Sequence, residues 1–354
     1  MIQIEYVWLD GKKTVRSKTK VMGRNENWSE CYMPTDPEDI PDWNYDGSST
    51  YQAFTESSEV FLYPVKVYPN PFVRSGSGCI VLCKTSDPLC SVTIAEEIFR
   101  EKPEDRPMFG LEQEFFIIDQ GTGKPLGWPI NGEPKAQGDY YCSVGAGCAF
   151  GRDYIDECME RLIEMKIPVT GMNYEVAPGQ AEFQVCDVGL DGAHALIMLR
   201  YVLARVGERY NYSIEYDPKP IQGNWNGSGC HVNFSTEAMR NEGGYEIIKG
   251  CMDYLERSHR DDLKLYGKNN EKRLTGKHET SSMDQFSWGV ANRATSVRVP
   301  TQTEKENKGY FEDRRPASNI DPYLVCSNLY KVCCLDHESL ANDPQVQEII
   351  KRYN

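Results

Sequence analysis

The fold is decided around the stretch Gly110-Leu111-Glu112-Gln113-Glu114-Phe115-Phe116, which begins a predicted strand that reaches residue 118. In a strand, residues i and i+2 point to the same face, so Glu112 and Glu114 project together. Two carboxylates on a core strand repel each other unless a cation lies between them. An exposed edge strand with solvated acids is the alternative, and the spacing alone leaves both interpretations open.

Helices and strands alternate on the C-terminal side of this strand. The spacing of apolar residues predicts strands over 180–185 and 231–234, and helices over 154–163, 192–208 and 245–266. On the N-terminal side, Thr93 and Glu96 have the spacing of a capping box ahead of a helix that ends before Pro103. The sequence therefore predicts an α+β protein, with a mainly-β domain over residues 1–86 and a larger catalytic domain over 87–354.

The composition limits the class of protein. The 354 residues are 40% hydrophobic and 26% charged, which is typical of a globular chain, and the net charge is −14. Phosphate backbones repel such a chain, so no nucleic-acid partner is expected. No apolar stretch approaches the ~18 residues of a membrane span, and the start has no signal-peptide pattern, so no membrane partner is expected. The 13 cysteines form no C-x-x-C pair, which favours reduced thiols in a cytoplasmic protein.

Two further segments carry acids and a histidine. Glu175 and Glu182 bracket the Pro178-Gly179 turn, and the glycine-rich loop 223–229 leads almost directly into His231. The backbone N–H groups of such a loop can hold an anion, and a histidine there can be a metal ligand or an acid/base. A lone histidine is more often structural, so the pattern leaves the role of His231 open.

The segment 272–315 reverses the charge of the chain. It holds nine basic and six acidic residues, and Arg298 lies between two valines in a predicted strand. Arginine binds carboxylates and phosphates through paired hydrogen bonds, although a mixed-charge surface is the alternative. No G-x-x-x-x-G-K-[ST] loop occurs, and no G-x-G-x-x-G motif follows a strand. Carboxylates for hard cations together with an arginine clamp indicate phosphoryl transfer.

Seven ordered segments resemble the glutamine synthetases of the eukaryotic (type II) family. They are 43–50 (WNYDGSST), 110–114, 173–185, 223–235, 273–280, 289–293 and 308–316. The resemblance implies a β-grasp N-terminal domain and a C-terminal catalytic domain whose curved antiparallel sheet, a half-barrel, is flanked by helices. It also implies a homo-oligomer of two stacked pentameric rings, a decamer, with active sites shared between neighbouring subunits.

The resemblance further implies a reaction and its cofactors. ATP-dependent ligation of ammonia to L-glutamate would give L-glutamine, ADP and phosphate through a γ-glutamyl phosphate. Two or three Mg²⁺ or Mn²⁺ ions would serve each site, with ATP as a substrate. Two alternatives remain: a ring-forming structural or regulatory relative without catalysis, and an enzyme of the same fold that ligates glutamate to a larger amine.

The motifs of the family imply a role for each matching residue. One metal ion would be bound by Glu114, Glu175 and Glu182, and a second by Glu112, His231 and Glu312. Glutamate would contact Asn224, Trp225, Asn226, Gly227, His231, Arg273 and Arg314. The nucleotide would contact Glu112, Glu182, Asn233, Ser235, Arg293, Arg298, Tyr310 and Glu312. The catalytic set would be Asp46, which takes a proton from ammonium in the neighbouring subunit's site, Glu279 on a closing flap, Arg293 and Arg314.

The chain departs from the family pattern beside these positions. The departures are Met108, Gly147-Cys148, Tyr174, Ala177, Ala181 and Cys186-Asp187. Tyr174 replaces a glycine directly before Glu175, whereas Ala177 and Ala181 replace a methionine and a tryptophan. A small-to-large change beside a ligand is expected to shift Glu175. We therefore expect effects on rates and nucleotide affinity rather than on the type of reaction.

Overall fold

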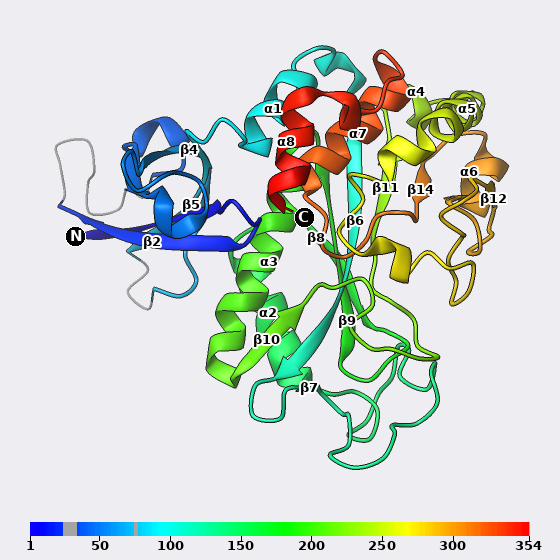
Figure 1. Ribbon diagram of the computed structural model, residues 1–354, viewed down its shortest axis with the longest axis horizontal. Coiled ribbons are helices and arrows are strands. Elements are labelled where there is room, and N and C mark those ends of the chain that lie inside the picture. The colour runs from blue at the N-terminus through cyan, green and yellow to red at the C-terminus, as the bar shows by residue number, and fades with distance from the viewer. Residues whose placement is uncertain (24–33, 74–76, 354) are drawn as a thin grey trace.

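The computed structural model describes residues 1–23, 34–73 and 77–353, and within these ranges the named strands form two sheets. The first sheet lies at one side of the molecule, and the long strands of the second sheet run through its centre (Figure 1). Helix α3 (Leu190–Tyr210) lies between them and contacts strands of both. The curled second sheet with helices along it confirms the predicted α+β class and half-barrel.

The first sheet consists of β1 (Ile2–Leu9), β2 (Val15–Met22), β3 (Trp43–Asp46), β4 (Glu59–Pro69) and β5 (Gly78–Thr85). Its order is β2-β1-β5-β4-β3, with β1 and β5 parallel and the other pairs antiparallel, which agrees with a β-grasp arrangement. Alternate residues serve different faces. Ile4 and Tyr6 belong to a small separate core, whereas Val7 and Ile80 join the main core of the molecule.

The second sheet consists of β6 (Met108–Asp119), β7 (Lys124–Pro125), β8 (Val169–Tyr174), β9 (Gln180–Val188), β10 (Tyr212–Glu215), β11 (Cys230–Ser235), β12 (Trp288–Val290), β13 (Val297–Val299) and β14 (Phe311–Asp313). Its main order is β12-β13-β14-β11-β6-β9-β8, and β7 and β10 pair with the far end of β6. The β12–β13 pair is parallel, so the sheet is not wholly antiparallel as predicted.

Strand β6 is central rather than at an edge, which decides between the two interpretations of Glu112 and Glu114. Phe109, Leu111 and Phe115 on one face of β6 are fully buried and belong to the main core. Glu112 and Glu114 lie on the opposite face and are half-buried. The two glutamates therefore sit side by side on an inner strand, which is one of the two interpretations that the stretch 110–116 left open.

The helices are α1 (Ser91–Phe99), α2 (Arg152–Glu164), α3, α4 (Glu237–Arg240), α5 (Gly244–Asp262), α6 (Thr301–Glu306), α7 (Pro322–Cys334) and α8 (Pro344–Tyr353). The helices predicted around residues 154–163, 192–208 and 245–266 are confirmed, although α5 ends at Asp262. Residues 192–203 of α3 are all buried, because this helix is covered on every side. The predicted capping box is wrong: α1 begins at Ser91 after Cys90, without a side-chain cap.

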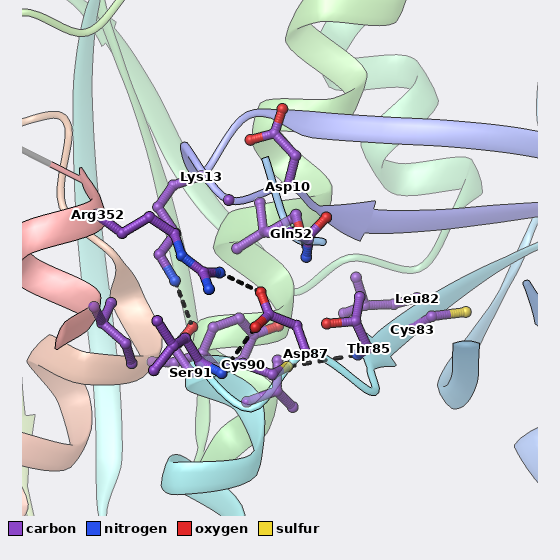
Figure 2. Close-up of a pocket in the computed structure, with 16 residues that line it drawn as sticks. Asp10, Lys13, Gln52, Leu82, Cys83, Thr85, Asp87, Cys90, Ser91 and Arg352 are labelled. Carbon is purple, nitrogen blue, oxygen red and sulfur yellow. Dashed lines mark hydrogen bonds and ion pairs between the residues drawn. The ribbon is translucent and has the colours of Figure 1, made fainter. Parts of the chain in front are cut away.

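A joint connects the first sheet to helix α8 at the C-terminal end. Figure 2 shows Arg352 of α8 pointing at Asp87, with which it forms an ion pair, and Lys13 donating to Ser91 at the start of α1. Lys13 also pairs with Asp321 at 2.9 Å. The cavity between these elements measures only about 20 Å³, which is room for about one water. The joint is therefore structural, and the domain boundary at residue 86 stays a prediction.

Two observations concern the whole described chain. No helix within the described ranges is long and apolar enough to cross a lipid bilayer. The cysteines of these ranges are all free thiols, and Cys31 lies outside the described residues. No disulfide therefore constrains the part of the chain that the structure describes.

Candidate functional site

The candidate site is assembled by the register of the second sheet. Residues directly opposite in neighbouring strands share a face. Polar residues that are far apart in the sequence thereby gather on the inner face of β6 and its neighbours. The cross-strand pairs are Glu112 with His231 and Gln184, Glu114 with Glu182, Glu182 with Asn173, and Glu312 with Asn233 and Arg298.

The first triad consists of Glu114, Glu175 and Glu182, whose carboxylate oxygens lie within 4.8 Å of one another. Glu114 and Glu182 come from β6 and β9, and Glu175 directly follows β8. Burial first, and the neighbouring carboxylates next, raise the pKa of Glu114 and Glu182 to about 8 and that of Glu175 to about 7. Three adjacent acids, one buried and two half-buried, that disfavour their own ionisation are the donor set of a divalent-cation site.

The second triad consists of Glu112, His231 and Glu312, whose ligand atoms also lie within 4.8 Å of one another. Nδ1 of His231 is 3.4 Å from a carboxylate oxygen of each glutamate. Burial, and next the charge of Arg314, hold the pKa of His231 well below its usual value. The imidazole is therefore neutral, which is the form that binds a metal ion.

Arginine side chains form direct ion pairs with the second triad, whereas within the described residues they act on Glu114 of the first triad only through their charge. Glu312 is fully buried, and its two oxygens accept hydrogen bonds from Arg298 and from Nη1 of Arg314, the latter at 2.6 Å. Arg273 is also buried, and its Nη2 lies 3.1 Å from Nε2 of His231. Two cations on one carboxylate leave that side of the site close to neutral before any ligand arrives.

A cavity of about 600 Å³ lies in front of both triads. Nε of Arg314 and Oδ1 of Asn226 are buried there without a hydrogen-bond partner among the described residues. A free donor and a free acceptor in one cavity suit a ligand that carries both a carboxylate and an ammonium group. The predicted site residues that line the cavity are Glu112, Glu114, Glu175, Glu182, Asn226, Gly227, His231, Arg273, Glu279, Arg293, Arg298 and Arg314.

A short loop with unusual backbone covers part of this cavity. Thr275 and Ser282 form an isolated bridge that closes the loop, and His278 and Glu279 between them have φ angles of +57° and +60°. Non-glycine residues rarely adopt this left-handed region, and such strain gathers at functional sites. Nη2 of Arg314 donates to the backbone oxygen of Glu279 at 3.2 Å, so the loop is tied to the second triad.

Comparison with known proteins identifies the family. A family model described as the catalytic domain of glutamine synthetase matches residues 94–245. The cytosolic glutamine synthetase isozyme of Pinus sylvestris is 45% identical over 341 residues, which cover 94% of this chain and 93% of that protein. This chain belongs to the glutamine synthetase family. A chloroplastic glutamine synthetase of Brassica napus is 46% identical over 94% of this chain and 78% of its own.

A viral relative is also similar over nearly the whole length. A protein of Acanthamoeba polyphaga mimivirus with a provisional assignment as glutamine synthetase is 48% identical over 339 residues, 94% of each chain. The viral protein and the Pinus sylvestris isozyme thus match this chain over nearly their whole lengths. The similarity spans both sheets, not only the triads.

Several residues predicted from the glutamine synthetase motifs lie beside the cavity rather than in its lining. Glu312 lies beneath the cavity as part of the second triad, and Asn233 donates to Glu112 at 2.7 Å. Tyr310 is 41% exposed, and partial burial raises its pKa, an effect that the charge of the neighbouring Arg298 opposes. The hydroxyl of Ser235 instead accepts a hydrogen bond from Arg240 at 2.9 Å, which occupies it.

The loop before β11 divides between the cavity and its surroundings. Asn226 and Gly227 line the cavity, whereas Asn224 is exposed and outside it. Trp225 packs its ring against that of Trp128, with centroids 5.2 Å apart, and its backbone oxygen accepts from Lys219. The structure of one chain therefore does not bring Asn224 and Trp225 to the predicted glutamate site.

Asp46 lies on the surface at the end of β3, away from the cavity of its own chain. Its carboxylate accepts from the hydroxyls of Ser48 and Ser49 at 2.6 and 2.9 Å. These hydrogen bonds, that from Ser48 first, lower its pKa below the usual value. Asp46 is thus ionised and turned outward, and a role in catalysis requires a neighbouring subunit.

Sequence reasoning missed several cavity residues. Tyr141, Asn173, Gln184, His278 and Thr280 also line the cavity. Asn173 and Gln184 each lie two positions from a glutamate of the first triad. Residues with this spacing share a face of a strand, so the spacing was a signal in the sequence that could have identified both. No pattern in the sequence distinguishes Tyr141, because its loop has no regular spacing.

The change at Tyr174 does not displace Glu175 from the first triad, contrary to expectation. Tyr174 lies directly opposite Ala181 in the β8–β9 pair, and both side chains belong to the buried core. Asn173 and Glu182 form the next pair and face the cavity. The large ring at 174 therefore occupies volume left by the small residue at 181, on the side of the sheet away from the ligands.

Proposed function

We propose that this chain is a glutamate–ammonia ligase, which joins ammonia to L-glutamate with hydrolysis of ATP to ADP and phosphate. The observation that carries the proposal is the pair of triads behind one cavity, in a chain 45–48% identical to glutamine synthetases over most of its length. No observation favours a ring-forming relative without catalysis or a ligase for larger amines.

We infer that the triads hold divalent cations, with Mg²⁺ or Mn²⁺ as the candidates. The residues fit such ions, because five carboxylates and one neutral imidazole form a hard, oxygen-rich donor set. Glu114, Glu175 and Glu182 would hold one ion, and Glu112, His231 and Glu312 the other. Bound cations would neutralise the phosphates of ATP and polarise the transferring group.

The arginines and the loop around Glu279 would handle the substrates. Arg314 has a free Nε for the carboxylate of glutamate, and Asn226 has a free Oδ1 for its ammonium group. Arg293 and Arg298 line the cavity and would pair with the phosphoryl group as it transfers to the γ-carboxylate. The loop that carries Glu279 would exclude water, because an acyl phosphate is hydrolysed when water reaches it.

The chain would function as a homo-oligomer with shared sites, and two stacked pentameric rings are the arrangement proposed. Asp46, which would deprotonate ammonium, faces away from the cavity of its own chain, and Phe54 nearby is 84% exposed. Val144, in the loop that follows the cavity residue Tyr141, is 87% exposed. Exposed apolar residues near both partners of the shared site support a contact between subunits. A cytoplasmic location is proposed because several relatives are named cytosolic isozymes.

One assay tests the proposal. Purified protein is incubated with ATP, Mg²⁺, glutamate and ammonium, and glutamine and phosphate are measured together. One phosphate per glutamine is the expected result. Phosphate without glutamine, or no turnover in an intact oligomer, would overturn the proposal. Replacement of ammonium by methylamine tests the larger-amine alternative, which predicts faster turnover with the amine.

A further inference from the structure

We propose that three carboxamide side chains, those of Asn173, Gln184 and Asn233, are positioning residues that each fix one metal-binding glutamate. Asn173 donates to Oε1 of Glu175 at 2.8 Å, Gln184 to Oε1 of Glu182 at 2.6 Å, and Asn233 to Oε1 of Glu112 at 2.7 Å. One oxygen of each carboxylate is held, and the other is left for an ion. The inference rests on the proposed metal sites and deepens them.

The chemistry of the pairs determines which way each amide points. A carboxylate only accepts hydrogen bonds, so the NH₂ group rather than the carbonyl of each amide must face it. An amide is uncharged, so the glutamate keeps its full negative charge for a cation. An arginine or lysine in the same place would hold the carboxylate equally well but would compete with the ion. Neutral donors are therefore the appropriate partners for a metal ligand.

The backbone leaves room for two of these amides. A Cβ atom on Gly110 would lie 3.2 Å from Cβ of Asn233, and a Cβ atom on Gly171 would lie 2.9 Å from Oε1 of Gln184. Both distances are shorter than ordinary contacts, so a side chain at either glycine would push the amide aside. The glycines and the amides thus form a built arrangement rather than a chance contact.

The three amides divide between the two triads. Asn173 and Gln184 act on Glu175 and Glu182 of the first triad, whereas Asn233 acts on Glu112 of the second. Partners that orient a metal ligand usually change the affinity for the ion by about 10- to 100-fold. Each amide should therefore affect one ion and leave the other unchanged, which a general loss of stability would not do.

The experiment measures metal affinity rather than activity. Mn²⁺ is titrated into the chelator-treated full-length protein without nucleotide, and the free ion is followed by electron paramagnetic resonance. Gln184→Met and Asn173→Leu keep the size of the side chain but lose the donor, and we expect each to weaken the first ion about 10- to 100-fold. Gln222→Met is the matched control, because the Gln222 amide is exposed and, among the residues that the structure describes, donates to the Lys219 backbone rather than to a carboxylate. With ATP present, Asn233→Leu should weaken the second ion instead.

A double variant separates positioning from support of the fold. If Gln184 acts through Glu182, adding Gln184→Met to Glu182→Gln should cost no further metal affinity. Should Gln184→Met fail to fold, Asn173→Leu with Glu175→Gln repeats the test on the other glutamate. Folded single variants that bind both ions within twofold of the unaltered protein would overturn the inference. The glutamine assay is independent of this result, so failure of the proposed reaction can be told apart from failure of the positioning role.

Discussion

The two triads use the same kind of ligand but differ in what surrounds them. In the first, amide and backbone N–H groups hold the glutamates, for example Gly229, which donates to Glu114 at 2.7 Å. In the second, Glu312 is already paired with Arg298 and Arg314. The first triad therefore repels itself until a cation arrives, whereas the second is largely neutralised within the chain. We infer that the first ion binds to the protein alone and that the second enters with the phosphates of ATP.

Removal of divalent metal should have the largest effect, because both triads are expected to lose their ions. Exhaustive chelation should reduce glutamine formation to background, and added Mg²⁺ or Mn²⁺ should restore it. Mn²⁺ titrated without nucleotide should show one tight site per chain, with a second site only when ATP is present. Full activity after chelation would contradict the assignment of the triads as metal sites. Two equally tight sites without ATP would contradict the proposed difference between the two triads.

Glu279→Gln should have the next largest effect, on the side of the first triad. Glu279 lines the same cavity as the first triad, and its charge adds to burial and to the charge of Glu182 in raising the pKa of Glu175. Besides closing the cavity, Glu279 would accept a proton from the attacking nitrogen after Asp46 has deprotonated ammonium. Loss of a general base usually lowers a rate by ~10²–10⁴-fold, while acyl phosphate would still form. We expect slow glutamine formation and more phosphate released per glutamine.

Asp284→Asn is the matched control for Glu279→Gln, because Asp284 lies in the same region of the chain but outside the cavity. This variant should retain the normal rate and ratio. A Glu279→Gln protein that makes glutamine at the unaltered rate, with one phosphate for each glutamine, would show that Glu279 is only a solvated loop residue.

Arg314→Lys tests the second triad and the loop together. Lysine lacks the planar fork that reaches Glu312, the backbone of Glu279 and a substrate carboxylate at once. A hydrogen bond to a charged group contributes about 1.5–3 kcal/mol, so kcat/KM for glutamate should fall about 10- to 150-fold. Arg298→Lys, on the other oxygen of Glu312, should instead raise the KM for ATP. Steady-state constants for glutamate within twofold of the unaltered enzyme would place Arg314 outside the site.

The smallest expected effect is a dependence of stability on pH that metal removes. The pKa of Glu114 and Glu182 is raised to about 8 and that of Glu175 to about 7, against an ordinary value of 4.5. A raised carboxyl pKa means that the folded state holds its protons longer than the unfolded state. The metal-free protein should therefore lose stability as pH rises from about 4.5 to 8.

Mg²⁺ takes the place of these protons, so the rise in Tm that Mg²⁺ causes should grow between pH 6 and pH 8. Thermal unfolding at three pH values, in chelator and in saturating Mg²⁺, measures this rise in Tm. Glu175→Gln, which removes one of the three acids, should reduce the dependence. If the rise in Tm that Mg²⁺ causes were the same at every pH, this would contradict the assignment of the first triad as the site where Mg²⁺ replaces protons.

Much of the fold followed from local patterns. The apolar spacing of residues 192–208 predicts a helix that the structure confirms as α3, and the stretch 110–116 predicts a strand that the structure confirms as β6. Patterns failed where a boundary depends on distant contacts. Thr93 has the spacing of a cap, yet the cap position of α1 is Cys90, three residues earlier, because Asp87 and Cys90 are fixed at the joint with α8 and β5.

By itself, the sequence determined that Glu112 and Glu114 share a face, because strand period is a property of the local backbone. Its motifs, through the resemblance to glutamine synthetases, also named the six candidate ligands. Only the tertiary structure decided which ligands face each other, since strand register is set by pairing between residues up to 127 positions apart, as in the pair Ser235 and Met108. It also decided that Arg298 and Arg314 pair with Glu312 of the second triad, and that Tyr174 is accommodated by Ala181 behind the sheet. Packing and charge compensation depend on neighbours in space, which spacing along the chain does not specify.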